Sequence, residues 1–283
     1  MIREQGPDDR AALEAILTAR VDQAMFPLTN LRTHGLAEGY FPSEHPHATR
    51  FWRVGDQSVV GLTRGGMILA LLAHGCDLSH LQAALTGQTV QGAAGPASSI
   101  RPVLQALGLA GTLARLDEDE PGFALDLARL RMPDLSRAKL VPASTIPRDL
   151  LITWRAAATV ETQGMPQSQA LDHAAQDVDG WLERDSHRVL LLAGKPVALT
   201  GFNAALPEIV QVGGVYTPPD LRNRGHARSA VALHLTEVRA RGCNRAVLFA
   251  ATPAAVRAYL ALGFQPADSF ALVLFHKTIN LPT

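Results

Sequence analysis

The sequence predicts an α/β protein of two domains. Its 283 residues exceed the size of one ordinary domain, which holds roughly 100–200 residues. In the second half, helical hydrophobic periods over 150–161 and 168–184 precede short apolar runs typical of strands. The first half carries the same kinds of element with a weaker pattern. Between them, the proline-punctuated polar stretch 133–149 is interpreted as a linker. The chain is therefore expected to divide near residue 140.

Turn-forming and capping residues indicate where the elements of the second half begin and end. A turn at Gly194-Lys195 joins two strands into a hairpin, and Gly213-Gly214 inside the third strand indicates a bulge or a close approach of ligand or backbone. Thr252-Pro253 is typical of a helix start, and Gly242 and Gly263 suit positions just after helix ends. The expected order is strands 188–193, 196–204 and 208–217, helix 226–241, strand 246–251, a helix ending at Leu262, and strand 270–275.

The first half suggests a degraded copy of the second. Its segment 90–96 (V-Q-G-A-A-G-P) resembles 212–218 (V-G-G-V-Y-T-P), which makes an internal duplication plausible. The other expected elements are helices 10–20 and 98–107, strands 51–54, 58–63 and 122–130, and 67–73 as a strand or a short buried helix.

Composition limits the classes of partner. Lys plus Arg and Asp plus Glu both number 26, so the formal charge is zero, which argues against nucleic acid or an anionic membrane as a partner. Hydrophobic residues make up 47% of the chain, as in a protein with a real core. No secretion signal or membrane-spanning run is recognisable, and Cys76 and Cys243 form no metal motif. The expected location is the cytoplasm, with both thiols reduced.

The segment 215–228 (V-Y-T-P-P-D-L-R-N-R-G-H-A-R) carries the clearest chemistry. It leads from a predicted strand into a predicted helix, with the pattern Arg222-x-x-Gly225-x-Ala227 between them. A helix N-terminus offers unpaired N–H groups and a positive dipole end, and small residues let backbone approach a ligand. The segment therefore predicts a phosphate-binding loop. The alternative is a solvated basic helix start.

Further along, 252–264 (T-P-A-A-V-R-A-Y-L-A-L-G-F) follows this loop. The loop and this helix together resemble the GNAT (GCN5-related N-acetyltransferase) superfamily, and the loop is especially similar to its tandem-domain FR47-like branch. The resemblance covers about 150–275 and implies two GNAT-like domains. Each would have a mixed, mostly antiparallel sheet flanked by helices. Residues 1–140 would be a degenerate copy without the loop, and 141–283 would bind acetyl-CoA.

The resemblance implies a set of coenzyme contacts. Backbone N–H groups of the loop would hold the pyrophosphate, and the bulge would free backbone groups for the pantetheine arm. One freed N–H could stabilise the oxyanion of the thioester carbonyl. No metal is implied. The implied coenzyme residues are Val215, Tyr216, Thr217, Arg222, Asn223, Arg224, Gly225, His226, Ala227, Arg228 and Thr252.

Two catalytic roles are implied in the same way. Tyr259 matches the family's general acid, although its spacing alone suits a half-buried aromatic. Glu208 begins the third strand, where many relatives carry a carboxylate that draws the amine's proton through water. The alternative interpretation of Glu208 is a solvated residue at a strand end. Glu161 and Asp220 are weaker candidates for the base. Thr252 replaces the usual Asn, and a helix cap suffices to explain it.

The expected function is transfer of an acetyl group from acetyl-CoA to a primary amine of a small molecule or peptide by direct attack. Two alternatives stay open. A non-catalytic acyl-CoA-binding module would keep residues 222–228 without needing Tyr259 or Glu208. An aminoacyl or peptide transferase would use aminoacyl-tRNA, against which the zero net charge counts.

Overall fold

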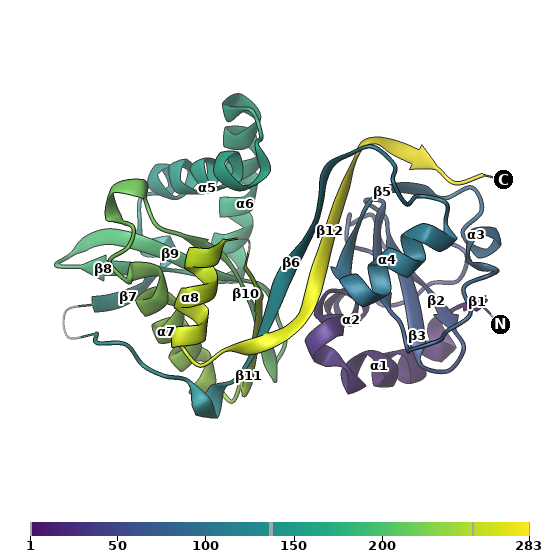
Figure 1. Ribbon diagram of the computed structural model, residues 1–283, viewed down its shortest axis with the longest axis horizontal. Coiled ribbons are helices and arrows are strands. Elements are labelled where there is room, and N and C mark those ends of the chain that lie inside the picture. The colour runs from purple at the N-terminus through teal and green to yellow at the C-terminus, as the bar shows by residue number, and fades with distance from the viewer. Residues whose placement is uncertain (1, 136–137, 251, 283) are drawn as a thin grey trace. The chain divides into compact units, whose positions relative to one another are not determined.

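The computed structural model describes residues 2–135, 138–250 and 252–282. Its chain forms two compact units. Unit 1 contains the residues up to 122 together with those from 267 onward, and unit 2 contains residues 123–266. Each unit is an α/β layer structure with helices on both faces of a sheet (Figure 1). Within the described ranges, no helix is both long and apolar enough to cross a lipid bilayer.

Unit 1 is built on an antiparallel meander that ends in a parallel pair. The strands β1, β2, β3 and β4 pair antiparallel in chain order, β4 pairs parallel with β5, and β12 pairs antiparallel with β5. Its elements are β1 (Ile2–Glu4), η1 (Pro7–Asp9), α1 (Arg10–Ala19), α2 (Val21–His34), β2 (Thr49–Val54), β3 (Ser58–Thr63), β4 (Met67–Leu71), α3 (Leu81–Ala84), β5 (Thr89–Pro96), α4 (Ala97–Ala106) and β6 (Ala114–Asp126).

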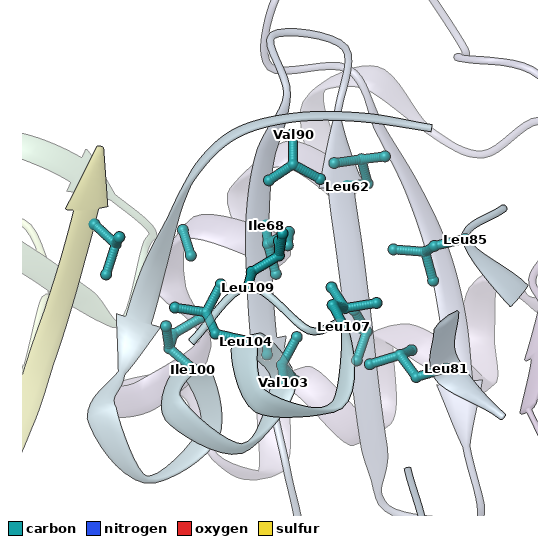
Figure 2. Close-up of a cluster of buried hydrophobic side chains, with 14 of the residues drawn as sticks. Leu62, Ile68, Leu81, Leu85, Val90, Ile100, Val103, Leu104, Leu107 and Leu109 are labelled. Atoms are coloured by element: carbon teal, nitrogen blue, oxygen red, sulfur yellow. The ribbon is translucent and has the colours of Figure 1, made fainter. Parts of the chain in front are cut away.

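The largest apolar cluster of unit 1 lies between α4 and the sheet. Figure 2 shows Ile100, Val103 and Leu104 of α4 packed with Leu62 of β3 and Ile68 of β4. Helical spacing places the α4 side chains on one stripe, and the two strands present alternate residues to it. β12 adds Ala271, Val273 and Phe275 to this core, so the end of the chain completes unit 1.

Unit 2 repeats the same plan. Its strands are ordered β7-β8-β9-β10-β11, antiparallel except for the parallel pair β10 and β11. Its elements are η2 (Leu127–Arg129), β7 (Ala138–Pro142), η3 (Ala143–Thr145), α5 (Arg148–Gln163), α6 (Gln167–Arg184), β8 (His187–Leu192), β9 (Lys195–Ala205), β10 (Ile209–Tyr216), η4 (Pro219–Leu221), α7 (His226–Arg239), β11 (Arg245–Phe249) and α8 (Pro253–Ala261), followed by β12 (Gln265–Asn280).

Two helix pairs cover the sheet of unit 2. α5 and α6 pack on one face through Trp154 and Trp181, while α7 and α8 pack on the other (Figure 1). β10 contributes to both cores: Val210 and Val212 join the α7/α8 cluster, and Tyr216 joins the α5/α6 cluster. β10 is thus buried over 209–212 and at Tyr216, and it is partly exposed over 213–215.

The element order supports the duplication that the sequence suggested. Both halves run strand, two helices, three strands, helix, strand, helix, strand, and in each the fourth and fifth strands pair parallel. The correspondence of 90–96 with 212–218, however, is wrong. In this order β5 is the counterpart of β11, and β4 is the counterpart of β10. Short Gly-containing apolar strings recur in buried strands, and two such strings are too little to align the copies.

The interpretation of 133–149 as a linker is also wrong. Residues 138–142 form β7, an edge strand paired with β8 from Ala138–Leu192 to Pro142–Arg188. Prolines are tolerated at such an edge because the strand donates hydrogen bonds on one side only. The second repeat begins at β7, near the expected division. The boundaries of the two compact units do not coincide with the start of the second repeat. They fall within β6 and β12, each of which has residues in both units.

His234 is a buried titratable group of unit 2. It lies on α7 with a 2% exposed side chain, and its ring stacks on Phe202 with centroids 3.8 Å apart. Burial, reinforced by Arg188 and Arg241, lowers the pKa of His234 to about 3. The unfolded chain therefore binds this proton near pH 6.5 and the folded chain does not. Stability present above pH 6.5 is lost as the pH falls towards 3.

We expect His234→Phe to flatten the acid side of the stability profile. At about 1.4 kcal/mol per pKa unit, the wild-type loss from this group is on the order of 4 kcal/mol between pH 6.5 and 3. Urea unfolding at several pH values, followed by Trp fluorescence in a Trp52→Phe background, reports on unit 2. The control is His276→Gln, an exposed histidine in β12. Equal acid slopes in the wild type and His234→Phe would refute the assignment.

Candidate active site

β10 separates from β11 partway along its length. The parallel pairing joins 209–212 of β10 to 245–248 of β11, and β10 continues beyond it to Tyr216 on its other neighbour, β9. The register between β9 and β10 shifts between Gly213 and Tyr216, and Gly214 has φ +61°. The predicted bulge at Gly213-Gly214 is therefore confirmed. The pairing of β10 with β11 ends at Val212 and Leu248, just before this bulge and one residue before the end of β11.

The chain then passes through a loop that is pinned by Arg222. Its Nε donates to the carbonyl oxygen of Thr217 at 2.9 Å, and its Nη2 lies 2.6 Å from Oε2 of Glu161. Its guanidinium also lies over the Tyr216 ring, 5.7 Å from the centroid. Glu161 stands near the end of α5, so this ion pair ties α5 to the loop. The structure thus gives Glu161 an ionic partner in the loop.

The start of α7 is built without a side-chain cap. Gly225 is the N-cap residue with φ +80°, and Asn223 just before it has φ +61°. A Ser or Asp cap would accept a hydrogen bond from the first turn, but glycine has no side chain with which to do so. The first turn of α7 also lacks an acidic residue. The orphan N–H groups of α7 and the positive end of its dipole are left for an anion.

Two buried polar atoms flank this helix start. Oγ1 of Thr217 and Nε of Arg228 are both shielded from solvent and have no hydrogen-bond partner within the described part of the chain. Buried polar atoms are seldom left unpaired. His226, the first residue of α7, has its pKa lowered by burial and by Arg224, so it adds little positive charge near neutral pH. The charge at this loop comes from Arg222, Arg224 and Arg228.

Tyr259 lies on α8, which follows β11 in the chain. The helix starts as predicted: Oγ1 of Thr252 accepts a hydrogen bond from the Ala255 N–H at 3.2 Å, and Pro253 is its first residue. The Tyr259 side chain is 7% exposed and meets the Phe264 ring edge to face at 5.9 Å. Burial raises the pKa of Tyr259 to about 12. The phenol is therefore protonated at every physiological pH.

Glu208 lies at the other end of β10. Its carbonyl oxygen accepts the N–H groups of Asn244 and Arg245 at 3.1 and 3.2 Å, where β11 begins. Gly213 lies five positions further along the chain. At ~3.3 Å per residue this is about 17 Å along the strand. The structure therefore does not bring Glu208 into contact with the bulge, and its role stays a prediction.

His187 was missed in the sequence. It begins β8, is 2% exposed, and lies flat on Trp181 with ring centroids 3.8 Å apart. Its Nε2 faces Gly201 of β9 and Gly214 of β10, where an added Cβ would overlap it or approach within 2.6 Å. The available signal was a histidine opening an apolar strand, and that pattern says nothing about glycines on β9 and β10.

Unit 1 builds the corresponding region differently. Between β4 and α3 its chain reads L-A-H-G-C-D-L-S-H over 72–80, without the Arg-x-x-Gly-x-Ala pattern. α3 is a single turn of four residues, whereas α7 has fourteen. A helix this short has little dipole and few aligned N–H groups. The expectation that the first half does not hold a coenzyme in the same way stays a prediction.

Comparison with known proteins adds a family and a fold. Residues 152–264 match the model of the acetyltransferase (GNAT) family. A GCN5-related N-acetyltransferase from Kribbella flavida shares 14% identity over 92% of this chain and 95% of its own, with a TM-score of 0.57. A Drosophila protein shares 14% identity over 96% of this chain and 98% of its own, with a TM-score of 0.58. No curated protein matches the sequence.

A third structural neighbour has a tandem architecture. A tandem GNAT protein from the clavulanic acid biosynthesis pathway shares 17% identity over 100% of this chain and 99% of its own, with a TM-score of 0.54. At such identities these neighbours establish the fold alone. The chain therefore has the fold of two GNAT-like α/β domains. The match to the GNAT family model covers residues 152–264, which lie in unit 2.

The ion pair between Glu161 and Arg222 can be tested by hydrogen exchange. Both side chains are 40% exposed, so we expect Glu161→Gln to lower the free energy of unfolding by less than ~1 kcal/mol. The loop should nevertheless loosen, because Arg222 loses its anchor on α5. Mass-spectrometric exchange should then show faster exchange in peptides covering 217–225. Glu183→Gln, an exposed change on α6, is the control. Unchanged loop exchange in Glu161→Gln would contradict a role for this pair.

Proposed function

We propose that unit 2 binds acetyl-CoA and transfers its acetyl group to a primary amine of a small molecule or peptide. One observation carries the proposal: β10 leaves β11 at the Gly213-Gly214 bulge and leads into a helix start without a side-chain cap. Among the described residues, β10 does not pair with β11 beyond Val212, so its backbone groups there would be available to an extended arm, and the start of α7 would hold a diphosphate. The match of residues 152–264 to the GNAT family model supports the same chemistry.

The diphosphate would lie on the first turn of α7. Backbone N–H groups of 225–228 would donate to its oxygens, with the positive φ of Asn223 and Gly225 turning the loop towards them. Arg224 and Arg228 add charge. Arg222 is held by Thr217 and Glu161, so we assign it mainly to shaping the loop. The full proposed set is Arg222, Asn223, Arg224, Gly225, His226, Ala227 and Arg228, with Thr252 in doubt because its hydroxyl caps α8.

The pantetheine arm would lie along Val215, Tyr216 and Thr217, beyond the end of the β10–β11 pairing. These residues follow the last pair that β10 makes with β11, so their groups on that side can pair with the amides of the arm. The carbonyl oxygen of Thr217 already accepts from Arg222. A backbone N–H next to the bulge would donate to the thioester oxygen as it becomes an oxyanion.

The transfer itself needs two proton movements. The neutral amine attacks the thioester carbon, the C–N bond forms, the C–S bond breaks, and the amine nitrogen loses a proton. Tyr259 would give its phenolic proton to the departing thiolate. In the proposed scheme the carboxylate of Glu208 draws the amine's proton through intervening water, because it lies too far from the bulge for contact. The unpaired Cys76 and Cys243 fit the reducing cytoplasm as the proposed compartment.

We expect Gly225→Glu to abolish acetyl-CoA binding while leaving the fold intact. The added carboxylate would stand at the anion site and repel the diphosphate. Calorimetric titration should show at least a 100-fold weaker affinity. Gly194→Glu is a matched control, because Gly194 also has a positive φ (+78°) and open space around it but lies in the β8–β9 turn. An affinity for Gly225→Glu within threefold of the control would remove the proposed loop.

Tyr259→Phe should lower kcat by about 10²–10³-fold with little change in acetyl-CoA affinity, because proton donation acts in the transition state. Glu208→Gln should lower kcat/KM for the amine. The assay follows thiol release over an amine panel, with the exposed Tyr40→Phe as the control. Full activity of Tyr259→Phe would eliminate it as the acid. Coenzyme binding without turnover for any amine would instead favour the non-catalytic binding module.

A further inference from the structure

The imidazole of His187 is a buried polar group that the proposed scheme does not use. It is held on three sides: its face lies on Trp181 at an interplanar angle of 13°, its Nδ1 lies 2.9 Å from Oγ of Ser186, and β9 lies beneath it. Its remaining nitrogen, Nε2, is shielded from solvent and has no hydrogen-bond partner among the described residues. The ring is therefore fixed in place with one polar atom unused.

The unused nitrogen faces the bulge. Pairing across three strands places His187 opposite Gly201, and Gly201 opposite Gly213. An added Cβ on Gly201 would overlap the imidazole, and one on Gly214 would lie 2.6 Å from Nε2. Two strands thus lack side chains where the ring lies, and Nε2 is the ring atom nearest to Gly214. This position adjoins the point where β10 leaves β11.

The surroundings keep the ring uncharged. Burial lowers the pKa of His187 well below its usual value, and three arginines add to the effect: Arg155 of α5, Arg184 of α6 and Arg188 of β8. His234 of α7 acts in the same direction. The imidazole is therefore neutral at physiological pH, so its role is that of a neutral base or hydrogen-bonding group rather than of a cation.

We propose that Nε2 of His187 accepts the proton of the attacking amine at the bulge. This inference rests on the proposed acetyl transfer and names the group that contacts the acceptor. With Nδ1–H donating to Ser186 Oγ, Nε2 presents its lone pair towards Gly214. As the C–N bond forms, the amine proton moves to Nε2, the C–S bond breaks, and the thiolate takes the proton of Tyr259. The imidazolium then passes its proton through intervening water to Glu208, as in the proposed scheme.

The geometry favours His187 over Glu208 for this contact. Nε2 adjoins the bulge, whereas Glu208 lies about 17 Å away along β10. A weak base suffices at this step, because the nitrogen becomes much more acidic once it is bonded to the carbonyl carbon. Glu208 then acts after His187, as the group that receives the proton through water.

The test removes the imidazole ring of His187 by mutation and then supplies free imidazole in solution. His187→Ala should retain acetyl-CoA affinity and lose about 10²–10⁴-fold in kcat/KM for the amine, the range of general-base contributions. Added imidazole should restore part of the rate. Pyrrole, a ring of the same size that can donate a hydrogen bond but has no basic nitrogen, should not. His173→Ala, an exposed histidine of α6, is the control.

Three outcomes would overturn the inference. Activity of His187→Ala within threefold of the wild type would show that the nitrogen is not used. Equal rescue by pyrrole and imidazole would assign the ring to packing or to hydrogen-bond donation towards the oxyanion. Loss of acetyl-CoA binding together with the rate would make His187 structural, and His187→Phe, which can keep the stack on Trp181, separates this case. If the wild type itself fails to bind or turn over acetyl-CoA, the proposed function fails first.

Discussion

The end of the pairing between β10 and β11 is the constraint on which the candidate site of unit 2 depends. A parallel pair with continuous pairing would leave no strand edge for a ligand. Gly213 and Gly214 end the pairing at Val212, and every part of the candidate site is arranged around that point. The loop leaves from it, α7 begins beyond it with an uncapped turn, and α8 follows the end of the strand that β10 has left. On the α5/α6 face, β8 and β9 bring an imidazole to the same place.

Features set by local chemistry could be predicted, and those set by tertiary packing could not. Gly213-Gly214, Gly225 and Thr252-Pro253 each have a conformational meaning of their own, so the bulge, the helix start and the cap follow from the sequence. α2 was missed because it contains Pro27 and a polar mixture, and packing against the sheet outweighs its poor propensity. His187 matters only through Gly201 and Gly214, which lie on other strands, and a single sequence does not reveal such a pairing.

The two repeats show how one architecture can differ in chemistry. Both contain the parallel strand pair and the helix after the fourth strand. In unit 1 that helix has one turn, the preceding segment lacks the arginine loop, and β4 has no pair of glycines. The two repeats have nearly the same topology. The arginine loop and the long helix that would hold a diphosphate are found only in the second repeat. The proposed coenzyme site therefore depends on a few residues at the end of one strand.

The placement of β12 sets an order of events during synthesis. Residues 270–280 pair with β5, and Ala271, Val273 and Phe275 fill the core beside α4. Unit 1 is therefore completed only after unit 2 has been synthesised, because its sheet includes β12, which follows unit 2 in the sequence. Until then the edge of β5 is open to any other strand, as an unpaired edge is a template for misassembly. Premature termination anywhere in the second half would damage the first, so the chain folds as a whole or leaves an exposed edge.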